Sequence, residues 1–505
     1  MKKLSFWDYQ GLSAFQKFVY KLKLFLCAIP AFFVKLGKVI GHGIKVAVLA
    51  VAHELKDLVM TLVSGSWRTK LSYLIMGFGN LTVGQIVRGL FYLAFEIVFI
   101  FYTVTTGSYW ISKLDNLGDT NSEMVYNAVL DTYVRVDGDD SFKILLYGGL
   151  SVVFCIVFIV LWRMNIKGSK VNDELLKAGK KPPKFKEDMH ELVDGSFHKT
   201  LLTIPIIGIT VFTVLPIIFM VFVAFTSYDG AHDGYSNLFT WVGWQNFAEL
   251  FDSTQSLGYA FTHILGWTLV WAVFATFTNY FFGIIVALLI NKKGIKFKKL
   301  WRGIFVLTIA IPQFITLLYI SKLFAVNGLV NAFLVKLGIL SSPYNFWAGT
   351  MSSRVLVIVI NIWIGIPHLM LIATGILMNI PEDLYESARI DGANAFQSFM
   401  KITMPYMLFI TGPYLLTSFI GNINNFNVIY LLTGGSVADP KLTTSGGSAT
   451  DVDLLITWLF KITTGTESNY KLASVIGILI FLVVATISVI VYNILPSNKN
   501  EEDFQ

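Results

Sequence analysis

The chain has 505 residues, of which 55% are hydrophobic and 14% are charged, and its formal net charge is +7. Soluble domains carry roughly 25% charged residues, so this composition excludes a soluble protein and indicates one that is embedded in a membrane. The positive charge is interpreted by its position along the chain, because Lys and Arg gather on the cytoplasmic side of membrane proteins. We therefore expect membrane lipids around the chain and no nucleic-acid partner.

Residues 1–87 form an amino-terminal region that we do not expect to cross the membrane. Lysines interrupt its apolar run, and each costs about 2.5 to 3.5 kcal/mol at the centre of a bilayer. At about 100° per residue, one arc of a helix holds Lys35, Lys38, His42 and Lys45. Two interpretations remain open: an amphipathic helix lying on anionic headgroups, or a helix packed on the cytoplasmic ends of the membrane helices.

Eight apolar segments follow, with lengths near or above the roughly twenty residues that cross a hydrocarbon core. The first contains Glu96, an acid that must face protein or a polar cavity rather than lipid. A structural hydrogen bond or a role in transport would each explain it. The sequence thus predicts an all-α polytopic membrane protein. The eight segments are 88–110, 143–162, 200–226, 259–290, 301–324, 354–378, 406–432 and 471–495.

The charged connections predict the orientation of these spans. The connections 163–199 and 291–302 are rich in Lys and Arg, which places both in the cytoplasm. The connection 111–142 is rich in acids and 227–258 has no Lys or Arg, so both face outward. With eight spans, both termini are then cytoplasmic.

Composition also predicts a division of the chain. The segment 163–199 is polar, highly charged and contains Pro, so we interpret it as a cytoplasmic linker. It separates a two-helix transmembrane hairpin at 88–162 from a six-helix core at 200–495, and 496–505 is a cytoplasmic tail. No remaining segment is long enough to be a soluble enzyme domain.

A polar stretch at 379–405 lies between the sixth and seventh spans, on the predicted cytoplasmic side. Pro381 suits the start of a helix, the acids that follow it favour the positive end of the helix dipole, and Gly392 permits a sharp turn. A short helix held on such a turn is suited to docking another protein. The alternative is an ordinary amphipathic loop.

Within this stretch the residues run E-S-A, three residues, G, nine residues, and then I-x-x-P. This order resembles the signature of the permease subunits of bacterial ABC importers, E-A-A, three residues, G, nine residues, I-x-L-P; Ser387 and Met404 depart from it. The resemblance implies a location in the bacterial cytoplasmic membrane and a coupling helix that docks into an ATPase subunit. The positions that carry this role are Glu386, Ser387, Ala388, Asp391, Gly392, Ile402 and Pro405.

Spans five, six and seven contain Pro312, Pro367 and Pro413. Each proline removes a backbone hydrogen bond and favours a kink, and broken helices line cavities more often than lipid. We therefore expect the path of a substrate to run along these spans.

Span seven also carries several amides. On an ideal helix, a small and polar face that suits sugar hydroxyls would be formed by Ser418, Gly421, Asn422 and Asn425. The alternative for the asparagines is hydrogen bonding between helices, worth about 0.6 kcal/mol per contact.

The sequences W-I-G-I-P in span six and N-I-N-N-F followed by L-L-T-G-G in span seven resemble the maltose-type sugar permeases. That family has six core helices with extra helices in front, and its cavity residues come from these two places. His368 stands where an aromatic residue is common and Gly421 where a larger residue is, and for Trp363 packing in the core is an alternative. The substrate-binding positions that the resemblance implies are Trp363, Ile364, Gly365, His368, Gly421, Asn422 and Asn425.

The chain has no G-x-x-x-x-G-K-[ST] motif and no H-E-x-x-H motif, so we expect no catalysis, no metal and no cofactor on it. ATP and Mg²⁺ would bind to two partner ABC ATPase subunits. The resemblance also implies a second permease subunit, an extracellular sugar-binding protein and a maltodextrin-like oligosaccharide as substrate, another di- or oligosaccharide being an alternative. Two rival functions are a proton-coupled secondary transporter that uses Glu96 or His368, and a membrane-embedded enzyme or receptor.

Overall fold

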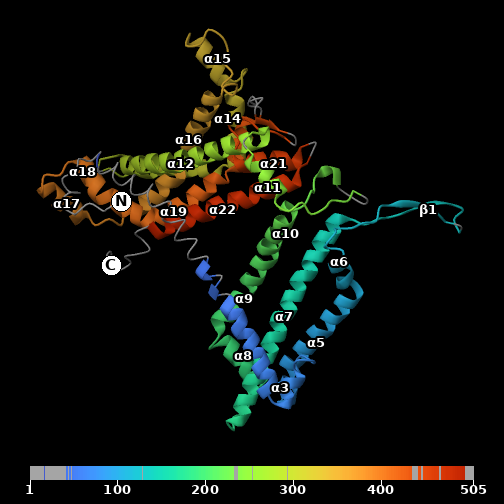
Figure 1. Cartoon of the computed structure of the whole chain (residues 1–505). Coiled ribbons are helices and arrows are strands. Elements are labelled where there is room, and N and C mark those ends of the chain that lie inside the picture. Colours follow the sequence, from blue (N-terminus) through green and yellow to red (C-terminus); the bar gives the residue numbers. More distant parts are fainter. Residues whose placement is uncertain are drawn as a thin grey trace. The chain divides into compact units, whose positions relative to one another are not determined.

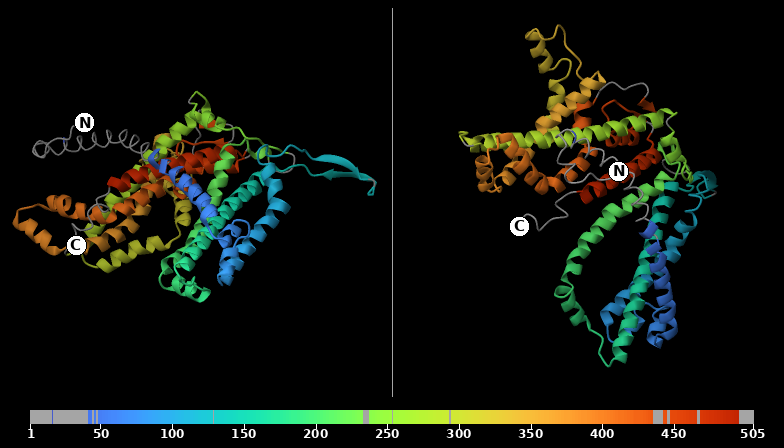
Figure 2. Two further views of the ribbon diagram at one scale, coloured as in Figure 1. Left: turned by 60° about the horizontal axis from the view of Figure 1, so that its bottom comes forward. Right: turned by 60° about the vertical axis from the view of Figure 1, so that its left-hand side comes forward.

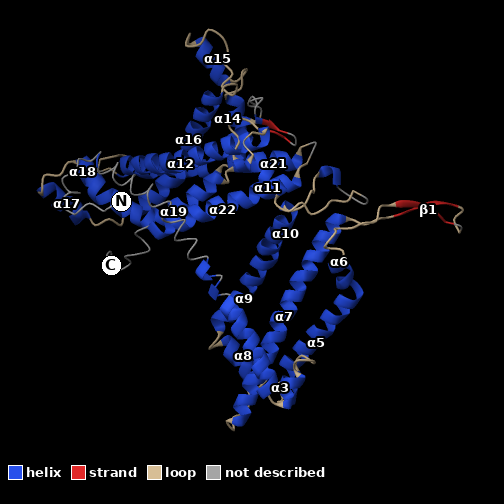
Figure 3. Ribbon diagram, in the orientation of Figure 1, coloured by secondary structure: helices blue, strands red, loops and turns tan. Residues whose placement is uncertain are grey.

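The computed structural model describes residues 16, 41–43, 45–46, 48–127, 129–232, 237–252, 254–292, 294–434, 442–444, 447–465 and 468–494. Helices make up most of these residues, and strands form only two short hairpins among them (Figure 3). The predicted interfacial residues Lys35 and Lys38 and the tail 496–505 lie outside the described residues. By its internal contacts the chain divides into unit 1, Met1–Asp115 with Leu146–Val214, and unit 2, Asn116–Leu145 with Leu215–Gln505.

Unit 1 contains a helix at 48–64 that runs beside α7 (Ser141–Lys177) (Figure 2). The remaining elements of this unit are α3 (Trp67–Leu71), α4 (Phe78–Thr82), α5 (Ile86–Tyr102), η1 (Thr103–Gly107), α6 (Ser108–Ser112), α8 (Phe185–Val193), α9 (Phe197–Ile209) and η2 (Thr210–Val214). The helix α7 extends to Lys177 and α8 follows, so much of the segment 163–199 is helical. Its role as a linker stays a prediction.

Ion pairs hold the helix 48–64 on α7. Arg163 Nε lies 2.8 Å from Glu54 Oε2, and Lys170 Nζ lies 2.7 Å from Asp57 Oδ1. Hydrogen bonds from Lys170 and then from Arg163 lower the pKa of Asp57 to about 2. The helix 48–64 is therefore packed against α7, while the interpretation of the basic arc from Lys35 to Lys45 stays a prediction.

Glu96 is buried on α5, with 9% of its surface exposed. Its Oε2 accepts a hydrogen bond of 2.8 Å from the backbone N–H of Met76. Of the two explanations for this acid, the structural hydrogen bond is thus observed.

Unit 2 holds a two-stranded antiparallel hairpin and the remaining helices (Figure 1). The hairpin is β1 (Glu123–Asn127) with β2 (Thr132–Val136), and a shorter one is β3 (Thr443–Thr444) with β4 (Gly447–Ser448). The helices are α10 (Leu215–Ala224), η3 (Gly230–His232), α11 (Gln245–Phe251), α12 (Ser256–Asn291), α13 (Lys298–Ala310), α14 (Gln313–Leu323), α15 (Leu329–Lys336), α16 (Thr350–Leu377), α17 (Glu382–Ile390), α18 (Ala395–Ser398), η4 (Phe399–Thr403), α19 (Met404–Ile423), α20 (Phe426–Thr433), α21 (Leu455–Thr464) and α22 (Tyr470–Ile494).

Seven helical stretches of the described chain are long and apolar enough to cross a membrane, and the bent pair α13 and α14 makes a possible eighth. The predicted all-α polytopic class is confirmed. Two predicted spans differ from what is observed. The segment 301–324 is broken into helices that meet at 91°, and the segment 406–432 is broken after Ile423.

The first break has a clear cause in Pro312. Proline has no N–H to donate and restrains the residue before it to extended backbone. Ile311 accordingly has φ −78° and ψ 125°, and α14 starts immediately after the proline. By contrast, α16 and α19 continue as helices through Pro367 and Pro413.

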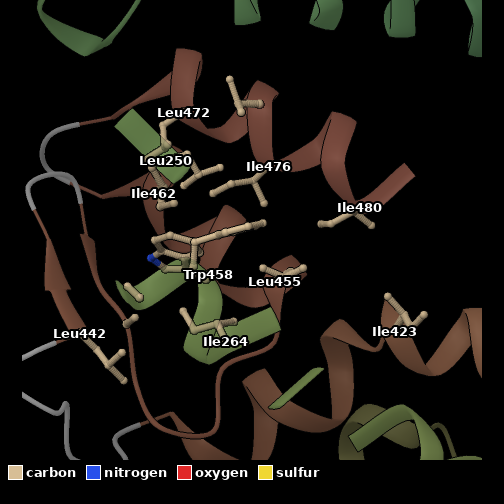
Figure 4. Close-up of a cluster of buried hydrophobic side chains, with 14 of the residues drawn as sticks. Leu250, Ile264, Ile423, Leu442, Leu455, Trp458, Ile462, Leu472, Ile476 and Ile480 are labelled. Atoms are coloured by element: carbon tan, nitrogen blue, oxygen red, sulfur yellow. The ribbon is translucent and has the colours of Figure 1, made fainter. Parts of the chain in front are cut away.

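An apolar core packs α12, α21 and α22 together (Figure 4). Trp458 of α21 is fully buried among Ile264, Leu455 and Ile476. A second contact surface of α12 packs along α16 and α19. Because α12 touches both helices, it fixes the positions of the two predicted substrate-binding segments.

Candidate functional site

The motif at 386–392 forms the second half of α17 (Glu382–Ile390) and the turn that ends it. Gly392 has φ +77°, a left-handed conformation that glycine adopts without steric cost. The N–H of Gly392 donates to the carbonyl of Arg389 at 3.0 Å, and the N–H of Ala393 donates to the carbonyl of Ala388 at 2.8 Å. These two bonds form a Schellman motif, which explains physically why a fixed spacing separates Ala388 from Gly392.

A second short helix, α18, follows the turn. Asn394 caps it: Asn394 Oδ1 accepts from the N–H of Gln397 at 2.8 Å, while Gln397 Oε1 accepts from the N–H of Asn394 at 2.9 Å. Glu386, Ser387 and Asp391 are exposed. The two short helices are therefore held in shape by their own backbone and caps.

Large apolar side chains project from this stretch. Ile390 is 86% exposed and Phe396 is 71% exposed. Exposed apolar groups rimmed by polar residues mark interaction sites, so α17 and α18 present a surface suited to a protein partner.

The stretch is tied to α19 through one polar contact and one helical turn. The hydroxyls of Tyr385 and Thr403 lie 2.9 Å apart. Thr403 ends the π-helical turn η4, which contains the half-buried Ile402 and continues directly into α19, where Pro405 is exposed in the first turn. The contact and the turn together connect α17 to the base of α19.

At the far end of α19 lies an open hollow of about 390 Å³ that we call the amide hollow. It brings together four of the predicted residues from span seven. Its lining residues are Gln313, Ser418, Gly421, Asn422, Asn424, Asn425, Phe426 and Asn427.

The predicted continuous helix through these residues is wrong. α19 ends at Ile423, and Asn425 stands between α19 and α20, where its Oδ1 accepts from the N–H of Val428 at 3.2 Å. An asparagine side chain that bonds to the backbone in this way favours a new helix start over continuation. The helix is therefore broken at the position where the amide side chains lie.

The side-chain amide and the backbone carbonyl of Asn422 form hydrogen bonds with other residues of the protein. Its Nδ2 donates to Thr276 Oγ1 at 3.0 Å, its Oδ1 accepts from Asn425 Nδ2 at 3.2 Å, and its carbonyl accepts from Trp271 Nε1 at 3.1 Å. Hydrogen bonding between helices, the alternative for the asparagines, is therefore observed for Asn422. Gly421 is exposed and leaves the hollow open beside it.

The residues predicted on α16 do not share one surface. Trp363 is 63% exposed and His368 is also exposed, yet at 3.6 residues per turn they point about 140° apart. Ile364 packs on a buried cluster. The His368 ring centre lies 6.1 Å from that of Tyr414 on α19.

Gly365 makes a close approach possible between α16 and α12. A Cβ at this position would lie 2.2 Å from Asn279 Nδ2. Asn279 and Thr276 were not predicted from the sequence as site residues, although each is a polar residue within the apolar segment 259–290. A polar residue within an apolar segment is the signal that could have identified both residues from the sequence.

The sequence is similar to those of known transport proteins. Residues 279–499 match the family described as binding-protein-dependent transport system inner membrane component. The chain is 32% identical over 443 residues to the maltodextrin transport system permease protein MalC of Streptococcus pneumoniae serotype 4, an alignment that covers 86% of this chain and 97% of MalC. This chain belongs to the oligosaccharide-type permeases of ABC importers.

Two relatives from Bacillus subtilis strain 168 extend the comparison. The permease is 32% identical over 449 residues to the maltodextrin transport system permease protein MdxF, covering 88% of this chain and 98% of MdxF. It is 31% identical over 375 residues to the galactooligosaccharides transport system permease protein GanP, covering 73% of this chain and 86% of GanP. The permease is thus a multi-pass membrane protein of a transport family rather than an enzyme family.

Proposed function

We propose that this permease carries a maltodextrin-like oligosaccharide across the cytoplasmic membrane of a bacterium and into the cytoplasm. The amide hollow is the observation that supports this proposal. It combines amide groups, which can both donate and accept hydrogen bonds, with the ring of Phe426. Neutral sugars, which carry many hydroxyls and apolar ring faces, need both kinds of contact.

The predicted substrate-binding residues fall into two groups under this proposal. Asn425 and Gly421 face the amide hollow and serve the sugar, while Asn422 holds α12 and α19 in place beside it. On α16, Ile364 and Gly365 fix the position of the helix through their packing. His368 and Trp363 lie on exposed surfaces, and a second permease subunit contributes the remaining part of each surface.

The energy for transport comes from other subunits in this proposal. The importer has two ATPase subunits that bind ATP and Mg²⁺, and one of them docks on α17 and α18 from the cytoplasm, where both termini of the permease also lie. The exposed Ile390 and Phe396 supply the apolar contacts. Movement of α17 passes through the Tyr385–Thr403 contact and η4 to α19 and so reaches the amide hollow. A sugar-binding protein delivers the substrate on the outer side.

Substitutions of Asn425 test the sugar assignment. Asn425→Leu removes both the amide and the cap of α20, whereas Asn425→Ser keeps a capping oxygen and removes only the amide. We expect both variants to raise the KM for maltotriose uptake by the complete importer, and only the leucine variant to reduce assembly. Wild-type uptake by Asn425→Ser would show that the residue acts as a helix cap and does not bind sugar.

A galactooligosaccharide is the second candidate substrate, supported by the similarity to GanP. Competition between labelled maltotriose and unlabelled galactooligosaccharide distinguishes the two. A proton-coupled mechanism is tested separately: uptake that stops with a proton uncoupler but continues after ATP depletion would contradict the importer assignment.

A further inference from the structure

Two helices that border the amide hollow continue together beyond it. α14 and α20 run side by side in the same direction, and Ser321 Oγ of α14 donates to the carbonyl of Leu432 of α20 at 2.8 Å. The amide hollow lies at the first residues of both helices, since Gln313 and Asn427 line it. A second hollow of about 620 Å³ lies at their last residues. We call it the lysine hollow, because Lys322 and Lys461 line it.

Lys461 of α21 is held in place by a buried acid. Asp453 is only 2% exposed, and its Oδ2 lies 2.6 Å from Lys461 Nζ. The carboxylate also accepts from Thr450 and from the hydroxyl of Thr457. An ammonium group has three N–H donors; among the described residues Lys461 donates to Asp453, and its further donors can serve a ligand in the hollow. Lys322 lines the same hollow from α14 and is exposed.

Tyr430 joins the two hollows. Its ring stacks on that of Phe426, with centroids 4.8 Å apart and planes 19° apart. Phe426 lines the amide hollow and Tyr430, which is 40% exposed, lines the lysine hollow. The two residues are one helical turn apart, a rise of about 6 Å along α20. A linear ligand could therefore contact both rings in succession.

The lysine hollow has the chemistry of a carbohydrate subsite. Tyr430 offers an aromatic surface for the apolar face of a sugar ring, and Lys322 and Lys461 offer donors for its hydroxyls. Sites of this kind combine aromatic walls with a few placed polar groups. The hollow is lined by two lysines and one acid, so it has more hydrogen-bond donors than one carboxylate can accept from. The hydroxyl and ring oxygens of a sugar can accept from these donors.

We propose that the lysine hollow is a second sugar subsite, which binds the part of a longer oligosaccharide that extends out of the amide hollow along α14 and α20. This inference rests on the proposed function and goes beyond it. It makes Tyr430 and Lys322 residues that set preference for chain length, while the amide hollow is sufficient for the shortest substrates.

The test compares glucans of increasing length, from maltose to maltoheptaose, in proteoliposomes that contain the complete importer. Tyr430→Ala should lower kcat/KM for maltoheptaose about five- to tenfold, the scale of one lost aromatic contact, and for maltose less than about twofold. Tyr430→Phe, which keeps the ring, should stay within about twofold of wild type at every length.

A second variant separates binding from packing, because Tyr430 also contacts Phe460. Lys322→Gln lies on a different helix and leaves those ring contacts intact, and it should show the same dependence on glucan length. Equal losses at all lengths in both variants, or no loss with maltoheptaose, would overturn the subsite. A wild-type importer that takes up no glucan of any length would instead refute the proposed function itself.

Discussion

Replacing Gly392 with Ala isolates the contribution of the turn that ends α17. No atom lies within 4 Å of a Cβ added at Gly392, so the substitution causes no clash. The destabilisation comes from the backbone alone, because the left-handed conformation at φ +77° is about 1 to 2 kcal/mol less favourable for a residue that has a Cβ. This corresponds to about a 5- to 30-fold lower population of the turn. Since α17 and α18 are oriented by this turn, we expect the sugar transported per ATP hydrolysed to fall about fivefold or more.

The assay measures ATP hydrolysis and sugar uptake together in proteoliposomes that contain the complete importer. Gly84→Ala is the matched control, because Gly84 also has a positive φ, +86°, and also has no atom within 4 Å of an added Cβ. It carries the same backbone strain but belongs to unit 1, whereas α17 belongs to unit 2. Unchanged coupling in a well-inserted Gly392→Ala importer, or equal uncoupling by Gly84→Ala, would refute the docking role of the turn.

Three further outcomes follow from contacts described above. Glu96→Leu leaves a buried backbone N–H without its acceptor and should destabilise the chain by about 1 to 3 kcal/mol, whereas Glu96→Gln keeps an acceptor oxygen and should unfold near the wild-type temperature in detergent; equal melting of both variants would contradict the bond. Gly365→Ala places a methyl group against a packed amide and should cost about 1 to 3 kcal/mol, while Gly375→Ala, which meets no atom within 4 Å, should not; thermal unfolding of the two variants compares them. The pKa of Asp57 is about 2 in the folded protein against an ordinary value of 3.8, so its ion pairs stabilise the helix 48–64 above pH 3.8 and are lost as the pH falls toward 2. Hydrogen exchange in that helix, corrected for intrinsic rates, should rise over this interval in wild type and be raised already at pH 7 in Asp57→Asn.

Apolar length predicted most of the membrane helices well. The predicted span 259–290 is observed as Ser256–Asn291, and 354–378 as Thr350–Leu377. Both are single helices, and the hydroxyls of Thr268 and Thr278 bond to carbonyls four residues earlier in α12 without breaking it. The predicted cause of the turn at Gly392 is confirmed by its positive φ.

Apolar length failed in span five, which breaks at Pro312, and in span seven, where a side chain caps a new helix. The segment 406–432 has no charged residue, and Asn425 ends the helix there by capping the next one. A hydropathy average does not register such a bond. The same local chemistry that broke the predicted helix also produced the amide hollow, so the error fell at the candidate site.

The substrate-binding residues on α16 were predicted by resemblance rather than by helical geometry. Counting residues per turn shows that Trp363 and His368 lie on different faces of any regular helix. Helical periodicity could therefore have divided this set before a structure was known. The packing of Gly365 against Asn279 depended on the register between two distant helices, which no local pattern in one segment encodes.

The Schellman turn makes the stretch from Pro381 to Asn394 a transplantable module. Its shape depends on backbone bonds that begin and end inside the stretch, together with the cap that Asn394 provides for the next helix. Side chains on its outer surface can therefore change without altering its path. An exchange of this stretch between two permeases should redirect each toward the other's ATPase, which would allow hybrid importers to be assembled from chosen transport and energising subunits.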